Sequence, residues 1–297
     1  MATLPSAVSV VEVGPRDGLQ NESALISTAD KIAFVDRLTN AGLRAIEVSA
    51  FVSPKWIPQL KDAADVFAGI TRRPGTRYSA LVPNLIGLER ALGAGVTDVA
   101  IFTAASETFN QRNTRRSIEE SFATYRDVVR EALSAGLRVR GYLSTAFGCP
   151  FEGPVSTEQV VALTERLLSL GVFEVAVSDT IGVAHPGQVR ALLPRLLATI
   201  PSTRIALHFH DTRGTALANV LAALDFGMAT FDASAGGLGG CPYAPRASGN
   251  LATEDLLYML RGLNIETDVA IDAVSDAALA LAPQLGHPLP SRYTQAR

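Results

Sequence analysis

The chain has 297 residues, of which 47% are hydrophobic, enough to bury a large core. A formal net charge of −3 and the lack of long apolar runs argue against a nucleic-acid-binding surface and a membrane span, so we expect neither partner. Two cysteines, Cys149 and Cys241, are too few for a disulfide framework, and the first residues do not resemble a signal peptide. We therefore expect a cytoplasmic protein in a reducing compartment.

Short β-rich runs alternate with helical stretches along the chain. The predicted strands are residues 9–13, 45–49, 78–82, 98–103, 139–144, 174–178, 204–210 and 230–234. Helices are predicted between them, and residues 105–116 are predicted as a long polar loop. A helix, a glycine and a strand recur at Gly42, Gly95, Gly136, Gly171 and Gly227. This recurrence indicates repeated βα units.

Eight βα units predict a parallel sheet, and eight is the number that closes a barrel. The alternative is an open doubly wound sheet, which requires a glycine-rich phosphate turn after the first strand. Residues 14–18 read Gly-Pro-Arg-Asp-Gly and lack that pattern. We predict a (β/α)8 TIM barrel with additional C-terminal helices, forming one catalytic domain over residues 1–297. The barrel is expected at about 8–262 and the helical extension at about 263–297.

Polar residues gather where the predicted strands end, which is where TIM barrels place their chemistry. They are Arg16, Asp17, Glu47, Ser49, Tyr142, Ser144, Ser178, Asp179, Thr180, His208 and His210, with Asn250 after the eighth strand.

Four of these residues form a candidate metal site. His208 and His210 stand at i and i+2, so a strand would point both imidazoles to the same face. The alternative for such a pair is two packed core histidines. With Asp17 and the amide oxygen of Asn250 on the same rim, the set offers mixed nitrogen and oxygen ligands. That set suits Mg²⁺ or Mn²⁺, with Zn²⁺ or Fe²⁺ as alternatives.

A second signal is the run Gly-Gly-Leu-Gly-Gly-Cys-Pro-Tyr at residues 236–243. Four glycines in five residues disfavour a helix or a regular strand. The functional interpretation is a mobile lid that presents Cys241, and the alternative is a plain flexible linker. Cys149 has no partner signal and is interpreted as structural.

At this point the sequence resembles the 3-hydroxy-3-methylglutaryl-CoA lyase family over nearly the whole chain. The opening motif is V-E-V-G-P-R-D-G-L-Q-N-E at residues 11–22. Further matching segments are residues 49–56, 148–153, 178–182, 208–212, 236–243 and 247–260. The resemblance implies a divalent-metal-dependent lyase that cleaves 3-hydroxy-3-methylglutaryl-CoA to acetyl-CoA and acetoacetate by a retro-Claisen reaction. It also implies a place in leucine degradation or ketone-body formation, an acyl-CoA substrate, and a homo-oligomer that is a dimer or larger.

The resemblance also assigns residues to roles. The metal ligands would be Asp17, His208, His210 and Asn250, the catalytic residues Arg16, Cys241, Asp179 and Glu47, and the substrate-binding residues Arg16, Gln20, Tyr142 and Thr180. Four positions depart from residues common in the family: Ser23, Arg213, Thr215 and Arg246. These departures bear on the acyl substrate, so one alternative is a lyase for a related 3-hydroxy-3-substituted acyl-CoA. A second alternative is a Claisen-type synthase on the same barrel. A metal- or acyl-CoA-binding barrel without turnover is a third alternative.

Overall fold

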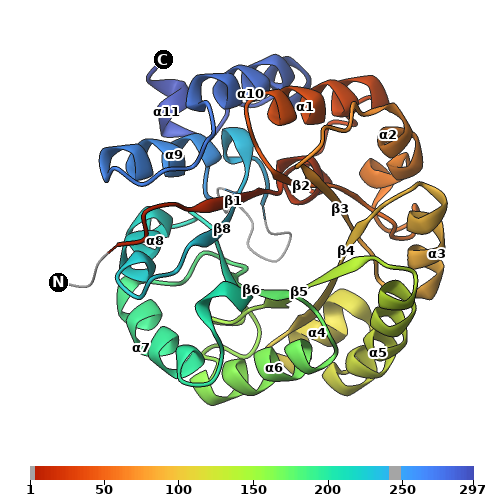
Figure 1. Cartoon of the computed structure of the whole chain (residues 1–297), viewed down its shortest axis with the longest axis vertical. Helices are drawn as coiled ribbons and strands as arrows, with labels where there is room; N and C mark the ends of the chain where they lie inside the picture. Colours follow the sequence, from red (N-terminus) through yellow and green to blue (C-terminus); the bar gives the residue numbers. More distant parts are fainter. Residues whose placement is uncertain (1–3, 241–248) are drawn as a thin grey trace.

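A computed structural model describes residues 4–240 and 249–297, in which eight parallel strands close into a barrel in sequence order (Figure 1). The strands are β1 (Ser9–Glu12), β2 (Ala45–Ala50), β3 (Arg77–Leu81), β4 (Asp98–Ala104), β5 (Arg138–Ser144), β6 (Glu174–Asp179), β7 (Ile205–Phe209) and β8 (Thr230–Ala233). Closure comes from β1, which pairs with both β2 and β8. The predicted TIM barrel is confirmed, and each strand lies within one or two residues of its predicted range.

Helices surround the barrel and cover its outer face (Figure 1). Eight of them follow the strands: α1 (Thr28–Asn40), α2 (Ala63–Gly69), α3 (Leu85–Gly93), α5 (Ile118–Ser134), α6 (Thr157–Ser169), α7 (Pro186–Leu197), α8 (Ala216–Leu224) and α9 (Thr253–Gly262). The additional C-terminal helices α10 (Ile271–Leu285) and α11 (Arg292–Gln295) complete the ring, and α10 packs against α1 and α9.

One predicted element is wrong. The stretch predicted as a long polar loop contains the helix α4 (Glu107–Thr114). Its sequence is polar and carries no apolar stripe, but Ser106 caps the start by accepting a hydrogen bond from the N–H of Phe109. Arg115 ends the helix in the left-handed conformation. Local capping and the packing of buried Phe109 outweigh a weak helical pattern here.

The predicted helix ends are confirmed by the backbone. All five glycines of the recurring pattern have positive φ, from 68° at Gly95 to 106° at Gly171. Glycine adopts this conformation without the clash that a Cβ would cause, so each helix can stop and turn back into the next strand. At the start of α5, Ser117 and Glu120 form a capping box.

The barrel interior mixes small apolar side chains with charged ones. Ala100, Ala176 and Ala206 lie there with Tyr142 in one apolar cluster, and small side chains leave room for larger polar neighbours. A much larger cluster fills the space between strands and helices. Hydrophobic burial therefore resides mainly outside the barrel, and the interior is available for polar groups.

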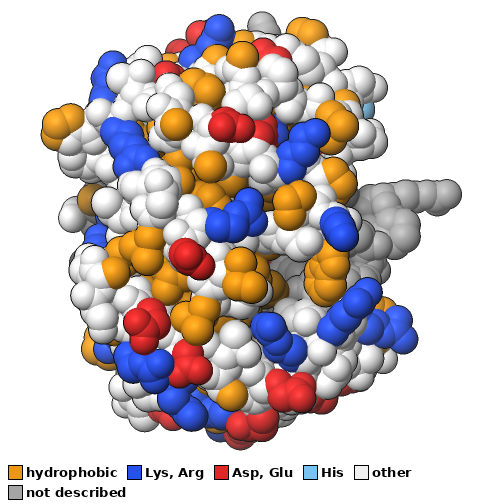
Figure 2. All heavy atoms as spheres, turned by 90° about the vertical axis from the view of Figure 1, so that its right-hand side faces the viewer, with side chains coloured by type: hydrophobic (Ala, Val, Ile, Leu, Met, Phe, Trp, Pro, Cys, Tyr) orange, Lys and Arg blue, Asp and Glu red, His pale blue; other side chains and the backbone are white. Residues whose placement is uncertain are grey.

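The outer surface carries both kinds of charge. On the face over α2 and α3, acidic and basic side chains are interspersed with apolar ones (Figure 2). Within the described ranges, no helix combines the length and the apolar character needed to cross a membrane.

Candidate active site

The side chains of Asp17, His208 and His210 converge at the carboxyl end of the barrel, with ligand atoms within 4.8 Å of one another. Asp17 lies in a single turn, η1 (Gly14–Gly18), that directly follows β1, and the carbonyl of Val13 accepts hydrogen bonds from the N–H groups of Arg16, Asp17 and Gly18. The histidines leave β7 on the same side, as their i and i+2 spacing predicts. Their ring centroids are 5.1 Å apart.

Asn250 reaches the cluster from the segment after β8. His210 and Asn250 form an antiparallel bridge, and the amide Nδ2 of Asn250 donates to Asp17 Oδ2 at 3.1 Å and to the carbonyl of Leu238 at 3.0 Å. Both N–H groups of this amide are therefore used, and its Oδ1 points away from Asp17 Oδ2 and the Leu238 carbonyl. That Oδ1 is buried and has no hydrogen-bond partner among residues 4–240 and 249–297. Nδ1 of His210 is also buried and has no hydrogen-bond partner among the described residues.

This arrangement fits a cation. Buried polar atoms are nearly always paired, so an unpaired amide oxygen and an unpaired imidazole nitrogen beside a carboxylate indicate a ligand that accepts their lone pairs. Burial, followed by the charge of His208, lowers the pKa of His210 to about 3, which keeps this ring neutral and able to ligate. Burial acts to raise the pKa of Asp17, but Arg16 and the histidines outweigh it and hold that pKa below its usual value. The predicted set of two histidines, one carboxylate and one amide is thus brought together.

Arg16 bridges the candidate metal ligand and a second carboxylate. Its Nη1 lies 2.5 Å from Asp17 Oδ1, and its Nε and Nη2 each lie 2.6 Å from Glu47 Oε2. Its guanidinium carbon is 5.5 Å from the centre of the Tyr142 ring. Because a guanidinium has five N–H groups, three such contacts leave two for a bound molecule.

The two carboxylates predicted to be catalytic, Glu47 and Asp179, have different surroundings. Burial raises the pKa of Glu47, although Arg16 opposes this, and Glu47 Oε1 has no hydrogen-bond partner within the described part of the chain. Burial also raises the pKa of Asp179, to about 6. Its two oxygens accept hydrogen bonds from the N–H groups of Val183 and Ala184 at 2.9 and 3.0 Å. Asp179 therefore holds the loop after β6, whereas one oxygen of Glu47 stays available.

The predicted substrate-binding residues lie around this cluster. Tyr142 stands between Arg16 and Arg140, and its hydroxyl accepts a hydrogen bond from Arg140 Nη1 at 2.9 Å. Thr180 Oγ1 accepts from the N–H of Thr145 at 2.8 Å, and Gln20 follows η1 in a half-buried position. Cys241 and Arg246 lie outside the described residues.

The described glycines of the predicted lid are closely packed. Gly236, Gly237 and Gly239 have positive φ, and Gly236 and Gly237 lie in the short turn η4 (Ala235–Gly237). A Cβ on Gly239 would lie 2.6 Å from Asn250 Nδ2, and one on Gly249 would lie 2.1 Å from the Gly239 carbonyl oxygen. These glycines thus permit a close backbone approach that sets Asn250 in place.

Sequence reasoning missed a group of buried charges below the cluster: Arg140, Glu174 and Asp232, all in the barrel interior, and Glu12 with Glu254 beneath the glycine turn. The sequence does mark these residues, because each charged residue interrupts a run of apolar residues in a strand or on the inner face of a helix.

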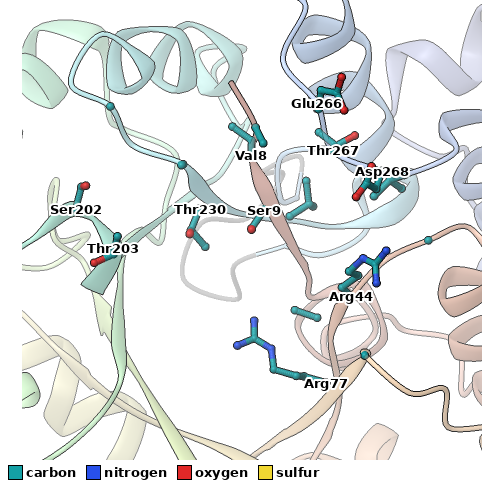
Figure 3. Close-up of a pocket in the computed structure, with 18 residues that line it drawn as sticks. Val8, Ser9, Arg44, Arg77, Ser202, Thr203, Thr230, Glu266, Thr267 and Asp268 are labelled. Atoms are coloured by element: carbon teal, nitrogen blue, oxygen red, sulfur yellow. The ribbon is translucent and has the colours of Figure 1, made fainter. Parts of the chain in front are cut away.

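A cavity of about 550 Å³ opens at the opposite end of the barrel (Figure 3). Arg44 and Arg77 line it together with Ser9, Thr230 and Asp268, which lie at the starts of strands or in the connection to α10. The candidate metal ligands lie at the carboxyl ends of β1 and β7, so this cavity is separate from the candidate active site.

Comparisons with known proteins agree with this geometry. A family model described as HMGL-like matches residues 7–280. A hydroxymethylglutaryl-CoA lyase of Bacillus subtilis is 52% identical, with 98% of this chain and 97% of the relative covered. A Pseudomonas aeruginosa protein named 3-hydroxy-3-isohexenylglutaryl-CoA/hydroxymethylglutaryl-CoA lyase is 51% identical, with coverages of 99% and 98%.

A solved structure is similar over its full length. The HMG-CoA lyase from Acinetobacter baumannii, in complex with coenzyme A and 3-methylmalate, superposes with a TM-score of 0.94 at 42% identity, covering 100% of this chain and 97% of that one. The sequence resembles these relatives over nearly the whole chain, and the barrel with its metal-type ligands is consistent with that resemblance. The chain belongs to the HMGL-like family.

Proposed function

We propose that this chain is a divalent-metal-dependent carbon–carbon lyase that cleaves 3-hydroxy-3-methylglutaryl-CoA to acetyl-CoA and acetoacetate. The observation that carries the proposal is the contact of Arg16 with Asp17 at 2.5 Å, because it places a permanent cation beside the candidate metal ligands. The names of relatives at about 50% identity over the full chain support the same reaction.

The residues that would hold the metal are Asp17, His208, His210 and Asn250. Two oxygens and two neutral imidazoles favour Mg²⁺ or Mn²⁺ as the native ion. When bound, such an ion supplies a Lewis acid that eases ionisation of the substrate C3 hydroxyl and orients it together with the substrate carboxylate.

Arg16 stabilises the enolate of acetyl-CoA that leaves when the C2–C3 bond breaks. Its remaining N–H groups donate to the thioester oxygen, where negative charge develops. Glu47 and Asp17 fix the guanidinium on one side, so it needs little reorientation during the reaction. Because a guanidinium does not give up its proton, Arg16 acts by charge and hydrogen bonding alone.

Glu47 accepts the proton of the C3 hydroxyl in this proposal. Its Oε1 has no partner within the described residues, whereas both oxygens of Asp179 hold backbone N–H groups. Asp179 is the second candidate, since its pKa of about 6 suits a base near neutral pH. Cys241 delivers a proton to the enolate carbon, a role that rests on the family motif. Gln20, Tyr142 and Thr180 contact the acyl-CoA.

A longer group at C3 is the second candidate for the substrate. The name of a relative at 51% identity includes 3-hydroxy-3-isohexenylglutaryl-CoA as a substrate. This chain also departs from common family residues at Ser23, Arg213 and Thr215. Arg213 donates to the carbonyls of Ile181 and Gly182 in the loop after β6, so its position bears on the shape of that rim.

The direct test is an assay of purified protein for acetoacetate release from 3-hydroxy-3-methylglutaryl-CoA with Mg²⁺ or Mn²⁺, beside the isohexenyl analogue. Metal-dependent acetoacetate release is expected. No product with either ion and either substrate would refute the proposal. Faster turnover of the isohexenyl analogue would instead assign the second substrate.

We further propose a cytoplasmic homo-oligomer, a dimer or larger, that acts in leucine degradation. The support is the two-cysteine composition and the family resemblance. Light scattering of the purified protein would measure the oligomeric state, and a monomeric mass would contradict that part of the proposal.

A further inference from the structure

A column of four charged or titratable side chains runs down the barrel interior from the candidate metal site. It consists of His208 on β7, Asp232 on β8, Arg140 on β5 and Glu174 on β6, none of them more than 7% exposed. The metal proposal uses only His208. The other three are buried charges for which that proposal has no role.

His208 is contacted at both ring nitrogens. Its Nε2 lies 4.0 Å from Asp17 Oδ2, on the side of the candidate metal ligands, and its Nδ1 lies 3.3 Å from Asp232 Oδ2. The adjacent strands set this contact, because His208 and Asp232 are register partners in the β7–β8 pairing. Asp232 thus meets the nitrogen that faces away from the metal ligands.

Arg140 fixes the carboxylate of Asp232 in both position and charge. Its Nη2 and Nη1 donate to Asp232 Oδ1 and Oδ2 at 2.7 and 3.1 Å, while its Nε donates to Glu174 at 2.8 Å. Both carboxylate oxygens of Asp232 thus accept from a guanidinium cation, and a carboxylate paired in this way offers His208 only acceptor sites. The ring nitrogen that faces this carboxylate, Nδ1, is therefore the donor.

Stability alone does not account for this arrangement. A buried ion pair is often no more stabilising than apolar side chains of the same volume, because both charges lose their hydration. The same interior is lined elsewhere by Ala100, Ala176 and Ala206, so the fold tolerates apolar residues there. What the charges add is a fixed acceptor beneath His208.

We propose that Asp232, held by Arg140, is a positioning residue that fixes His208 as its Nδ1–H tautomer and thereby presents Nε2 to the metal. The inference rests on the proposed metal site and extends it to a second layer of residues on β5 and β8. Partners of this kind commonly set the orientation and basicity of a ligating imidazole.

The tautomer is measurable in the wild-type protein without substrate. The chain has four histidines, so a long-range ¹H–¹⁵N spectrum of the metal-free protein contains four imidazole rings. His185→Gln, His287→Gln and His210→Gln variants would assign His208 by elimination. We expect its Nδ1 to be protonated when the ring is neutral. A neutral ring protonated at Nε2 would overturn the proposal.

Metal affinity tests the same point by mutation. Asp232→Asn can turn its amide N–H toward His208 Nδ1 and so favour the tautomer protonated at the ligating nitrogen. We expect Mn²⁺ alone to bind about 10–100-fold more weakly, as measured by calorimetry. Glu174→Gln is the matched control, because it removes a carboxylate from the same arginine without touching His208. It should change the Mn²⁺ affinity by less than about 3-fold.

A triple variant separates positioning from folding. Asp232→Leu, Arg140→Met and Glu174→Gln together remove the three buried charges of the column, so none is left unpaired, but His208 loses its acceptor. The positioning role predicts a folded protein with weakened Mn²⁺ binding. Wild-type Mn²⁺ affinity in this variant or in Asp232→Asn would show that the pair is only structural. Should either variant fail to fold, the wild-type tautomer measurement decides the question, and none of these results depends on whether the substrate is correctly named.

Discussion

At the level of single residues, Arg16 links the two halves of the candidate site. Its contacts join Asp17 among the metal ligands to Glu47, the proposed proton acceptor. Removing the guanidinium would leave two buried carboxylates. A bound metal would still balance Asp17, and Glu47 could neutralise itself by taking a proton, because burial already raises its pKa. The charge of Arg16 is therefore more important for turnover than for assembly of the metal site.

We predict that Arg16→Gln lowers kcat by about 10³-fold while Mn²⁺ still binds. The reason is that the developing enolate charge depends on this cation, whereas a bound metal would still balance the charge of Asp17. Steady-state kinetics and calorimetric titration with Mn²⁺ measure the two effects separately. Arg16→Lys is the control. It keeps the positive charge but not the planar guanidinium with its several N–H donors, so its kcat should fall between those of wild type and Arg16→Gln. A variant with near wild-type kcat would remove Arg16 from this role.

His210 offers a sharper test of the ligand set. Its Nδ1 is buried without a hydrogen-bond partner in the described ranges, so its lone pair is open to an ion. His210→Ala should weaken Mn²⁺ binding by about 100-fold or more in a calorimetric titration. His287→Ala is the comparison, because His287 pairs with Glu22 at the surface and should leave the affinity unchanged. Equal affinities in the two variants would mean that the assigned ligands are wrong.

The sequence predicts the ligands of the metal more completely than their supports. His208 and His210 are recognisable because the i and i+2 spacing of a strand is fixed, and Asp17 follows a recognisable strand end. Asp232 and Arg140 are 92 residues apart and meet only because β5 and β8 both line the closed barrel. Nothing local marks that pairing. Predicting it requires knowing which face of each strand points inward.

At the level of elements, Gly239 and Gly249 permit the close backbone approach that places Asn250. The clash is severe at Gly249, where a Cβ would stand 2.1 Å from the backbone carbonyl oxygen of Gly239. The glycine-rich run reads as a flexible lid from composition alone, but in residues 236–240 glycine also allows close packing. Composition cannot distinguish these uses, because both require the absence of a side chain.

Gly249→Ala should therefore displace Asn250 and weaken Mn²⁺ binding by about 10-fold or more, with some loss of stability. Gly262→Ala is the matched control, since a Cβ there meets nothing within 4 Å and the residue ends the helix α9. The control should bind Mn²⁺ normally and be unchanged or slightly more stable. If Gly249→Ala also binds normally, the segment has enough freedom to restore Asn250.

Glu12 ties three elements together beneath the same turn. It accepts hydrogen bonds from the N–H groups of Gly14 and Ala235 and from the hydroxyl of Thr253, which joins β1, η4 and α9. Complete burial raises its pKa from 4.5 to about 7, although these hydrogen bonds oppose the shift. The folded state thus binds a proton that the unfolded chain has already lost.

The pH dependence of stability follows with a definite sign. The contribution of protonated Glu12 is complete below about pH 4.5 and is lost as the pH rises through about 7, a change of roughly 3 kcal/mol. Glu12→Gln should remove this fall from the free energy of unfolding measured in urea between pH 5 and 8. Glu119→Gln is the control: a hydrogen bond from Arg166 lowers the pKa of exposed Glu119, so its titration lies below this window. Identical slopes in wild type and Glu12→Gln would refute the assignment.

At the level of the whole molecule, barrel closure depends on pairing the first strand with the last. The eight strands were predictable because each βα unit repeats the same local signals, whereas α4 was missed because its helix depends on one cap and one buried ring. The candidate metal site spans the closure. Asp17 follows β1, His208 and His210 belong to the β7 end, and Asn250 follows β8.

A metal that binds these four residues should therefore stabilise the closed barrel as well as serve the reaction. The unfolded chain separates Asp17 from His208 by 191 positions, so it does not present the site, and binding to the folded state alone stabilises that state by mass action. With Mn²⁺ at about 100 times its dissociation constant, the free energy of unfolding should rise by roughly 2.7 kcal/mol over the value in EDTA. Urea denaturation of wild type and His210→Ala under both conditions measures this, with the gain expected only in wild type. An equal gain in the variant would place the stabilising ion elsewhere, and no gain in wild type would mean that the cluster does not hold Mn²⁺ in the folded protein.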